Sequence, residues 1–299
     1  MTEERSFNKL NRNLHQDVLN LWDECFGDLP IVTQRLLKAY GAVCSKKAYT
    51  HHKIRTNISY EKPKQVEQRI FDRETCFNKD DVQTKQAQAL VDKILKKMSN
   101  IDTQTSKFLK DFLKDKEVVV TVDKGLSDDA CFGGFNPESK KLYIELNAGC
   151  FYHHTKNPNL FNEASIARTV GHEIGHAVEK ISRSSKTNPN SIGYSSNSWE
   201  VESFCDAFGS VLALQAGYSL SPSIEKMKMF EDKDEEIHKE IDPHPTLKQR
   251  RKLAELIDRA FPDAKRELSH FSEEICSVNW DKKTIKEKEV CIENYSQER

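Results

Sequence analysis

Apolar residues recur at helical spacing in residues 162–181, which read NEASIARTVGHEIGHAVEKI. Steps of about 100° per residue gather the apolar side chains on one side of a helix and place His172 and His176 on the opposite side. Asn162 is a suitable N-cap, and Glu163 is favourable in the first turn, because a helix N-terminus has unpaired N–H groups and partial positive charge. The pattern predicts a helix whose packed face consists of Ile166, Val170, Ile174, Ala177, Val178 and Ile181.

The same periodicity predicts helices before and after this stretch. Residues 1 to about 115 are expected to be mainly helical, and the apolar series from Ala87 to Leu95 is one example. Downstream, we expect one helix to start near Asn197, another to open at Pro222 and a further one to cover about 245–261. Gly217 is expected to end the first of these, since glycine readily adopts the conformation of a helix C-terminus.

Two short segments have the pattern of strands. Residues 117–122, EVVVTV, are rich in β-branched side chains and predict a buried strand. Residues 141–146, KLYIEL, alternate apolar and polar side chains, which predicts a half-buried strand with an edge position as one option. Between them, Gly133 and Gly134 are expected to permit a tight reversal and close backbone approach. The fold class predicted is therefore α+β, mostly helical, with a small sheet.

The composition limits the classes of partner and the cellular compartment that we expect for this chain. The chain has 299 residues, 37% hydrophobic content and a formal net charge of -1, so it has no basic surface for nucleic acid. Its N-terminus lacks the apolar core of a secretory signal, and no apolar run approaches the roughly 20 residues that span a bilayer. The eight cysteines follow no CxxC spacing, which favours reduced thiols. We expect a soluble cytoplasmic protein, with export as an effector by a signal-independent route as the alternative.

Residues 172–176 read HEIGH, which is an HExxH motif. Residues four apart share a helix face, so His172 and His176 can bind the same metal ion with Glu173 beside it. Zinc in hydrolases commonly takes three protein ligands and keeps a position for water. Glu202, on the next predicted helix, is the expected third ligand, and Asp206 is expected to accept a ring N–H from a ligand histidine. We therefore predict one Zn²⁺ site; the alternative is that these side chains form ordinary solvated helix faces.

Four motifs in order carry a family resemblance. They are HEIGH, then Glu202-x-x-x-Asp206-x-x-Gly209, then Ala216-Gly217-Tyr218, and then His244-Pro245-x-x-x-x-Arg250. The chain resembles, from about residue 85 to 261, the gluzincin metalloendopeptidases of the CAAX prenyl protease and heat-shock membrane protease type, in their soluble form. Residues 135–151 together with the sequence DPHP are also similar to neprilysin-type gluzincins.

The resemblance implies a division of the chain and further roles. It implies a zincin-like metallopeptidase domain at 83–265, after an N-terminal helical region at 1–82 of unknown role and before a charged C-terminal extension at 266–299. His244 would donate to the oxyanion, with a helix-capping role as its alternative, and Arg250 would hold local structure around the ligands. The segment that begins at Asp129 is similar to the family's substrate strand, which implies substrate contacts at Ala130, Phe132, Gly133 and Gly134.

The predicted activity is zinc-dependent hydrolysis of peptide bonds in protein or peptide substrates. Metal-activated water would attack the peptide carbonyl, and Glu173 would take the proton of that water and pass it to the leaving amine. Three alternatives stay open, namely a protease fold that serves as an inactive interaction module, a neprilysin-type peptidase and a secreted bacterial effector protease.

Overall fold

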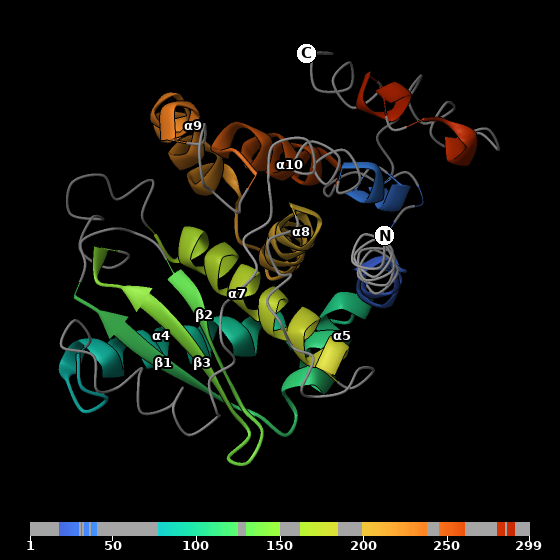
Figure 1. Cartoon of the computed structure of the whole chain (residues 1–299). Coiled ribbons are helices and arrows are strands. Elements are labelled where there is room, and N and C mark those ends of the chain that lie inside the picture. The colour runs from blue at the N-terminus through green and yellow to red at the C-terminus, as the bar shows by residue number, and fades with distance from the viewer. Residues whose placement is uncertain are drawn as a thin grey trace, which may run out of the picture.

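The computed structural model describes residues 18–29, 31, 33–35, 37–40, 77–124, 130–149, 162–184, 199–237, 245–260, 280–284 and 286–290. This part of the chain is mostly helical and contains a small mixed sheet of three strands, which confirms the predicted α+β class (Figure 1). Within these residues, no helix has both the length and the apolar run needed to cross a membrane.

The sheet has the strand order β1-β3-β2, formed by β1 (Glu117–Asp123), β2 (Ala130–Asn136) and β3 (Lys141–Asn147). Strand β3 is parallel to β1 and antiparallel to β2, so it lies in the centre of the sheet. The edge position considered for residues 141–146 is therefore wrong, and so is half-burial, because Tyr143 is 0% and Glu145 only 8% exposed. The alternation of apolar and polar residues describes the polarity of one strand, whereas the packing of the fold determines whether one or both faces of that strand are covered.

The expected glycine reversal is also wrong, because residues 130–136 form β2. The register shifts between Phe132 and Gly134, and Gly134 has φ 136°, so the second glycine permits a bulge within a strand rather than a turn. The chain reverses just after β2, where Lys140 has φ 56°. Asn136 supports this turn, because its Oδ1 accepts hydrogen bonds from the backbone N–H groups of Glu138 and Ser139.

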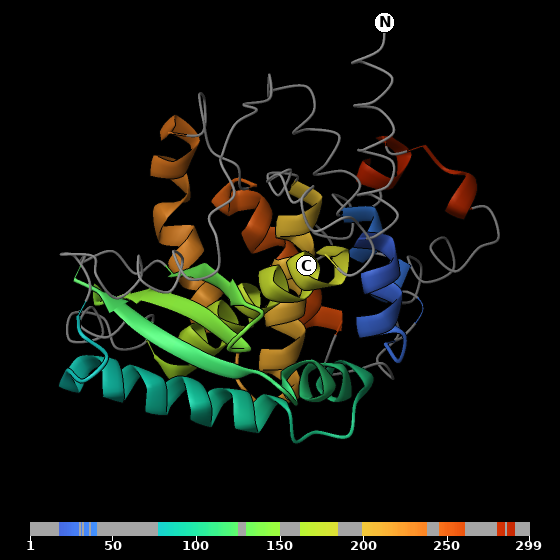
Figure 2. The same cartoon turned by 60° about the horizontal axis from the view of Figure 1, so that its bottom comes forward.

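Helix α4 (Val82–Met98) runs along one face of the sheet, as Figure 2 shows in teal. Its buried Val91 belongs to the same hydrophobic cluster as Val120 of β1 and Ile144 of β3. The amide of Gln88 pairs with the β1 backbone, donating to the Val118 carbonyl at 2.9 Å and accepting from the Val120 N–H at 2.8 Å. The side chain thus satisfies backbone groups of β1 on the side away from β3.

Helix α7 (Glu163–Ser184) carries the HExxH motif and begins as predicted. Asn162 Oδ1 accepts hydrogen bonds from the N–H groups of Ala164 and Ser165 at 3.0 and 3.1 Å, which is the expected N-cap. The predicted packed face is buried except for the partly buried Ile181. The helix also contacts β2 and β3 at the sheet.

Helix α8 (Trp199–Gln215) crosses α7 at very short range. A Cβ at Gly209 would lie 2.4 Å from the Arg168 carbonyl oxygen and 2.6 Å from the His172 backbone nitrogen, so only glycine fits this crossing. Residue numbers along α8 fall as those of the facing residues of α7 rise, from Gly171 against Gly209 to Gly175 against Cys205, so the helices run antiparallel. Gly217, with φ 75°, ends α8 as predicted.

Two further helices follow α8 in the chain, and one contacts α7 while the other contacts α8. Helix α9 (Ser221–Ile237) contains Pro222 in its first turn, and α10 (Leu247–Ala260) packs against both α8 and α9, so the two predicted helices are confirmed. Thr246 and Gln249 form a reciprocal cap at the start of α10, since the N–H of each residue donates to the side-chain oxygen of the other.

The N-terminal helical residues pack against the side of α8 formed by Phe204 and Phe208. Trp22 makes an edge-on contact with Phe204, with ring centroids 5.6 Å apart, and Phe26 lies 6.4 Å from Phe208. Helix α5 (Gln104–Leu113) anchors the same segment, because buried Thr105 donates to the Cys25 carbonyl at 2.6 Å. Trp280, in the short helix η3 (Trp280–Lys282), belongs to the same core. Residues near the N-terminus therefore pack against α8, and Trp280 near the other end of the chain joins the hydrophobic core.

Candidate metal centre

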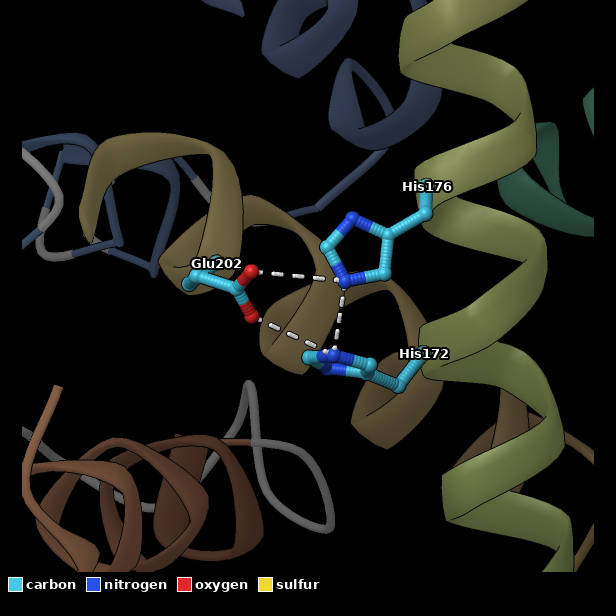
Figure 3. A group of neighbouring side chains, drawn as sticks. All are labelled: His172, His176 and Glu202. Atoms are coloured by element: carbon cyan, nitrogen blue, oxygen red, sulfur yellow. Dashed lines mark hydrogen bonds and ion pairs between the residues drawn. The ribbon is translucent and has the colours of Figure 1, made fainter. Parts of the chain in front are cut away.

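Three predicted ligand side chains converge between α7 and α8 (Figure 3). His172 and His176 point from successive turns of α7 toward Glu202 of α8. The two Nε2 atoms lie 3.0 Å apart, and the Glu202 carboxylate oxygens lie 3.4 Å from His172 Nε2 and 3.5 Å from His176 Nε2. All three side chains are at least largely buried, so the alternative of a solvated helix face is excluded for them.

The spacing and chemistry of these atoms suit a divalent cation. Bonds of about 2.0–2.1 Å from zinc to nitrogen or oxygen place tetrahedral ligand atoms roughly 3.3–3.4 Å apart. The observed separations of 3.0 to 3.5 Å bracket this value. Two imidazoles and a carboxylate are also a ligand set that leaves a coordination position for water or substrate. The residues present therefore fit a metal ion held between α7 and α8.

Asp206 lies one turn beyond Glu202 and contacts the other nitrogen of a ligand ring. His172 Nδ1 is 2.9 Å from Asp206 Oδ1, and the Asp206 side chain is 1% exposed. This contact leaves His172 Nε2 directed at the metal position. Burial lowers the pKa of His172, but the Asp206 charge and the hydrogen bonds with Asp206 and Glu202 outweigh it and raise the pKa to about 9. A positive charge is thus strongly favoured here, even without a metal.

Two arginines hold the Asp206 carboxylate. Arg250 of α10 binds it through two hydrogen bonds, from Nε to Oδ2 and from Nη2 to Oδ1, both 2.8 Å long. Arg168 of α7 adds a hydrogen bond from Nη2 to Oδ1 at 2.9 Å. Burial would raise the pKa of Asp206, but Arg250, Arg168 and His172 hold it well below its usual range. Asp206 is therefore a carboxylate at any ordinary pH.

Arg168 was not identified from the sequence as a site residue. Its spacing from the motif could have identified it, because Arg168, His172 and His176 follow one another at intervals of four residues and so lie along one side of the helix. A basic residue in line with two ligand histidines indicates a buried acidic partner, which the structure identifies as Asp206. Gly171 and Gly175 also indicate the contact with α8, because small residues four apart on a helix are typical of a close crossing with another helix.

His176 has a different partner behind its ring. Its Nδ1 lies 3.4 Å from the Sγ of Cys205, which is fully buried. Burial raises the pKa of the Cys205 thiol well above its usual value, so the thiol is neutral. A neutral thiol is a weak hydrogen-bonding group, so it restrains the His176 ring less than a carboxylate would.

Glu173 lies next to His172 on α7 and is 5% exposed. Burial raises the pKa of its carboxyl group above the ordinary value, although His172 and His176 oppose that rise. A carboxylate with a raised pKa is a better proton acceptor than one in water. Its burial and its electrostatic interaction with both histidines make Glu173 a suitable acid–base group for this centre.

Five predicted site residues remain, namely His244 and four residues of β2. His244 lies outside the described residues. Ala130, Phe132, Gly133 and Gly134 all belong to β2, which is an edge strand among the described strands and contacts α7.

Comparison of the chain with family models, curated proteins and solved structures finds no match. The case for a function therefore rests on the motifs and on the geometry of the site.

Proposed function

We propose that this chain is a zinc-dependent metalloendopeptidase that hydrolyses peptide bonds in protein substrates. The observation that carries the proposal is the buried cluster of His172, His176 and Glu202, whose ligand atoms have separations of 3.0 to 3.5 Å. The cluster includes both histidines of the HExxH motif, and Glu173 lies next to His172 on the same helix. Three such ligands and an adjacent carboxylate are the requirements of metal-assisted hydrolysis.

The chain's own residues would divide the chemistry between them. Zinc bound by His172, His176 and Glu202 would act as a Lewis acid, which polarises a peptide carbonyl and makes water more acidic. Glu173 would accept the proton of the attacking water and deliver it to the leaving amine, a role that its raised pKa supports. Asp206 would orient His172 by accepting its Nδ1–H. His244 remains the predicted donor to the oxyanion.

Strand β2 supports a peptide as the substrate. It lies at one edge of the described sheet and contacts the helix that carries the histidines. An edge strand can add an extended peptide through main-chain hydrogen bonds, and the bulge at Gly134 changes the direction of this strand locally. We assign Ala130, Phe132, Gly133 and Gly134 to this substrate contact, as the motif resemblance implies.

The order of the elements supports a zincin-like fold of the gluzincin type. A helical segment and then a small sheet precede the HExxH helix, and an antiparallel helix that supplies Glu202 and Asp206 follows it. The motifs on these helices resemble those of the CAAX prenyl protease and heat-shock membrane protease type. A soluble, cytoplasmic form of such an enzyme is part of the proposal.

The test compares the wild-type chain with the Glu173→Gln variant. Both proteins are purified, their zinc content is measured by elemental analysis, and each is incubated with a peptide library prepared from a whole-proteome digest. We expect both to hold zinc and only the wild type to cut peptides, because an amide cannot accept the proton of water. Cleavage should stop when a chelator removes the metal and return when zinc is added.

Two results would contradict the proposal. If the wild type holds zinc but cuts no peptide, the chain is a metal-binding interaction module rather than a protease. If Glu173→Gln cuts at the wild-type rate, Glu173 is not the general base.

A further inference from the structure

Arg168 is a buried cation that the proposed chemistry does not itself require. It lies on α7 one turn before His172, and its side chain is 7% exposed. Its Nη2 donates to Asp206 Oδ1 at 2.9 Å, and its Nε donates to Ser210 Oγ at 3.1 Å. Burying a guanidinium is costly unless it is paired and hydrogen-bonded, so these contacts define a specific position for this side chain.

Asp206 already has a complete partner in Arg250. The Arg250 guanidinium binds both carboxylate oxygens, at 2.8 Å each, which neutralises the charge and uses the planar match of the two groups. Arg168 and His172 then bring the donors on Asp206 to four, which matches the roughly four acceptor sites of a carboxylate. Neutralising Asp206 therefore does not explain the presence of Arg168.

The origin of the donors distinguishes the two arginines. Arg250 reaches Asp206 from α10, whereas Arg168 reaches it from α7, the helix that also carries His172. Arg168 and His172 contact the same oxygen, Asp206 Oδ1, from successive turns of α7. Ser210 supports this arrangement, because it accepts from Arg168 and donates to the Asp206 carbonyl at 2.6 Å. The oxygen behind the His172 ring is thus fixed relative to the helix that carries the ring.

We propose that Arg168 is a positioning residue for the metal centre, which acts through Asp206 to fix the orientation of the His172 ring. The inference rests on the proposed metal site and adds to it a residue that touches neither the metal nor the substrate. Removing Arg168 would leave Asp206 Oδ1 with the Arg250 donor from α10 and with no donor from α7 except His172 itself, so the position of this oxygen would no longer be tied to the helix that carries the ring. Loss of such a supporting contact typically weakens metal binding by about 10- to 100-fold.

The experiment uses the full chain and the variants Arg168→Met and Arg168→Lys, with Arg251→Met as the matched control. Arg251, like Arg168, is paired with carboxylate, here Glu231 and Glu255, but it is only partly buried and lies outside the cluster. The measurements are the zinc dissociation constant by chelator competition, the visible spectrum of the cobalt-substituted protein, and the melting temperature. The cobalt spectrum reports the geometry of the ligands and does not depend on catalysis.

We expect Arg168→Met to weaken zinc binding about tenfold and to change the cobalt spectrum. Arg168→Lys should lie between Met and the wild type, since an ammonium keeps the charge but cannot reproduce the fork of the guanidinium. Arg251→Met should lower the melting temperature and leave the zinc constant and the cobalt spectrum as in the wild type.

The proposal is overturned if the Arg168 variants lower the melting temperature but keep the wild-type zinc constant and cobalt spectrum. It is equally overturned if Arg251→Met weakens zinc binding as much as they do. Should Arg168→Met fail to fold, Arg168→Lys decides by the same comparison. A wild type that binds zinc but cuts no peptide contradicts only the proposed hydrolysis, and the ratio of zinc constants still decides the role of Arg168. A wild type that takes up no zinc overturns both.

Discussion

The two histidines of the cluster lie one turn apart on α7, yet their surroundings differ. The His172 side chain is 5% exposed, and its Nδ1 contacts a carboxylate that two arginines hold in place. The His176 side chain is 18% exposed, and its Nδ1 contacts a neutral thiol at 3.4 Å. His172, Asp206, Arg168 and Arg250 form an interior network of charges, which we call the His172 region. His176 and Cys205, the His176 region, lie closer to solvent on the histidine side and are joined by a weak contact.

With a metal bound, this difference would make His172 a fixed ligand and His176 an adjustable one. Hydrogen bonds that involve ionised groups are about twice as strong as neutral ones, and the thiol is weaker still. Turning the His172 ring would break a charge-assisted contact at Nδ1, whereas turning the His176 ring would break only a weak contact with a thiol at that atom. We therefore expect the His172 region to set the position of the metal and the His176 region to accommodate changes in coordination.

The largest effect should follow from removing any of the three ligands. His172→Ala, His176→Ala and Glu202→Ala should each reduce the zinc content from about one per chain to near zero, because a hydrolytic site holds zinc with three protein ligands. Loss of either histidine should therefore reduce the zinc content to the same extent. Elemental analysis of protein purified without added metal provides the test, and full zinc content in Glu202→Ala would mean that another acid is the third ligand.

Asp206→Ala should have the next largest effect and break the His172 region alone. The change leaves the buried Arg168 and the partly buried Arg250 without their shared carboxylate, and breaking a buried ion pair costs about 3–5 kcal/mol. It should also weaken zinc binding by roughly 10- to 100-fold. The free energy of unfolding and the zinc dissociation constant are to be measured together, with Asp206→Asn as a milder change that keeps an acceptor oxygen. Wild-type values for Asp206→Ala would show that the carboxylate supports neither the fold nor the metal.

Alanine substitutions at Gly209 and Gly175 test how closely α7 and α8 pack at two points of their crossing. A Cβ at Gly209 would meet backbone atoms of Arg168 and His172 at 2.4 and 2.6 Å, whereas one at Gly175 would meet Cys205, with its nearest atom at 2.9 Å. Overpacking costs about 1–3 kcal/mol, and alanine regains up to roughly 1 kcal/mol of helix propensity. Urea unfolding should therefore give the greater loss for Gly209→Ala. Equal losses of unfolding free energy in the two variants would mean that α7 and α8 pack no more closely at Gly209, next to His172, than at Gly175.

Cys205→Ala should have the smallest effect on the metal. The thiol contributes a weak contact to His176, so zinc binding should weaken by less than about threefold, against the 10- to 100-fold expected at Asp206. The same chelator competition measures both variants. A tenfold loss in Cys205→Ala would show that the thiol restrains its histidine as firmly as the carboxylate does, and the two regions would then be alike.

Several features of this site could be predicted because they depend on residues close together in the chain. The turn of a helix sets the spacing of His172 and His176, so an HExxH motif places both imidazoles on one face wherever that helix lies. The N-cap at Asn162 and the helix end at Gly217 are equally local, since each depends on backbone groups within a few residues. These predictions needed no knowledge of the rest of the fold.

Other features depend on contacts between residues far apart in the chain. The alternation in residues 141–146 predicted a half-buried strand, because alternation describes only the strand itself. In the fold, β3 has a neighbouring strand on each side, and side chains on both of its faces are buried. Asp206 could be matched to a histidine by motif, but its contact with Arg168 depends on a helix crossing that Gly209 makes unusually close. The sequence thus determined which side chains form the candidate metal site and their spacing along each helix, because helix geometry is local. Only the tertiary structure decided which charged groups meet between helices, because that depends on side-chain volume and on the register of distant segments.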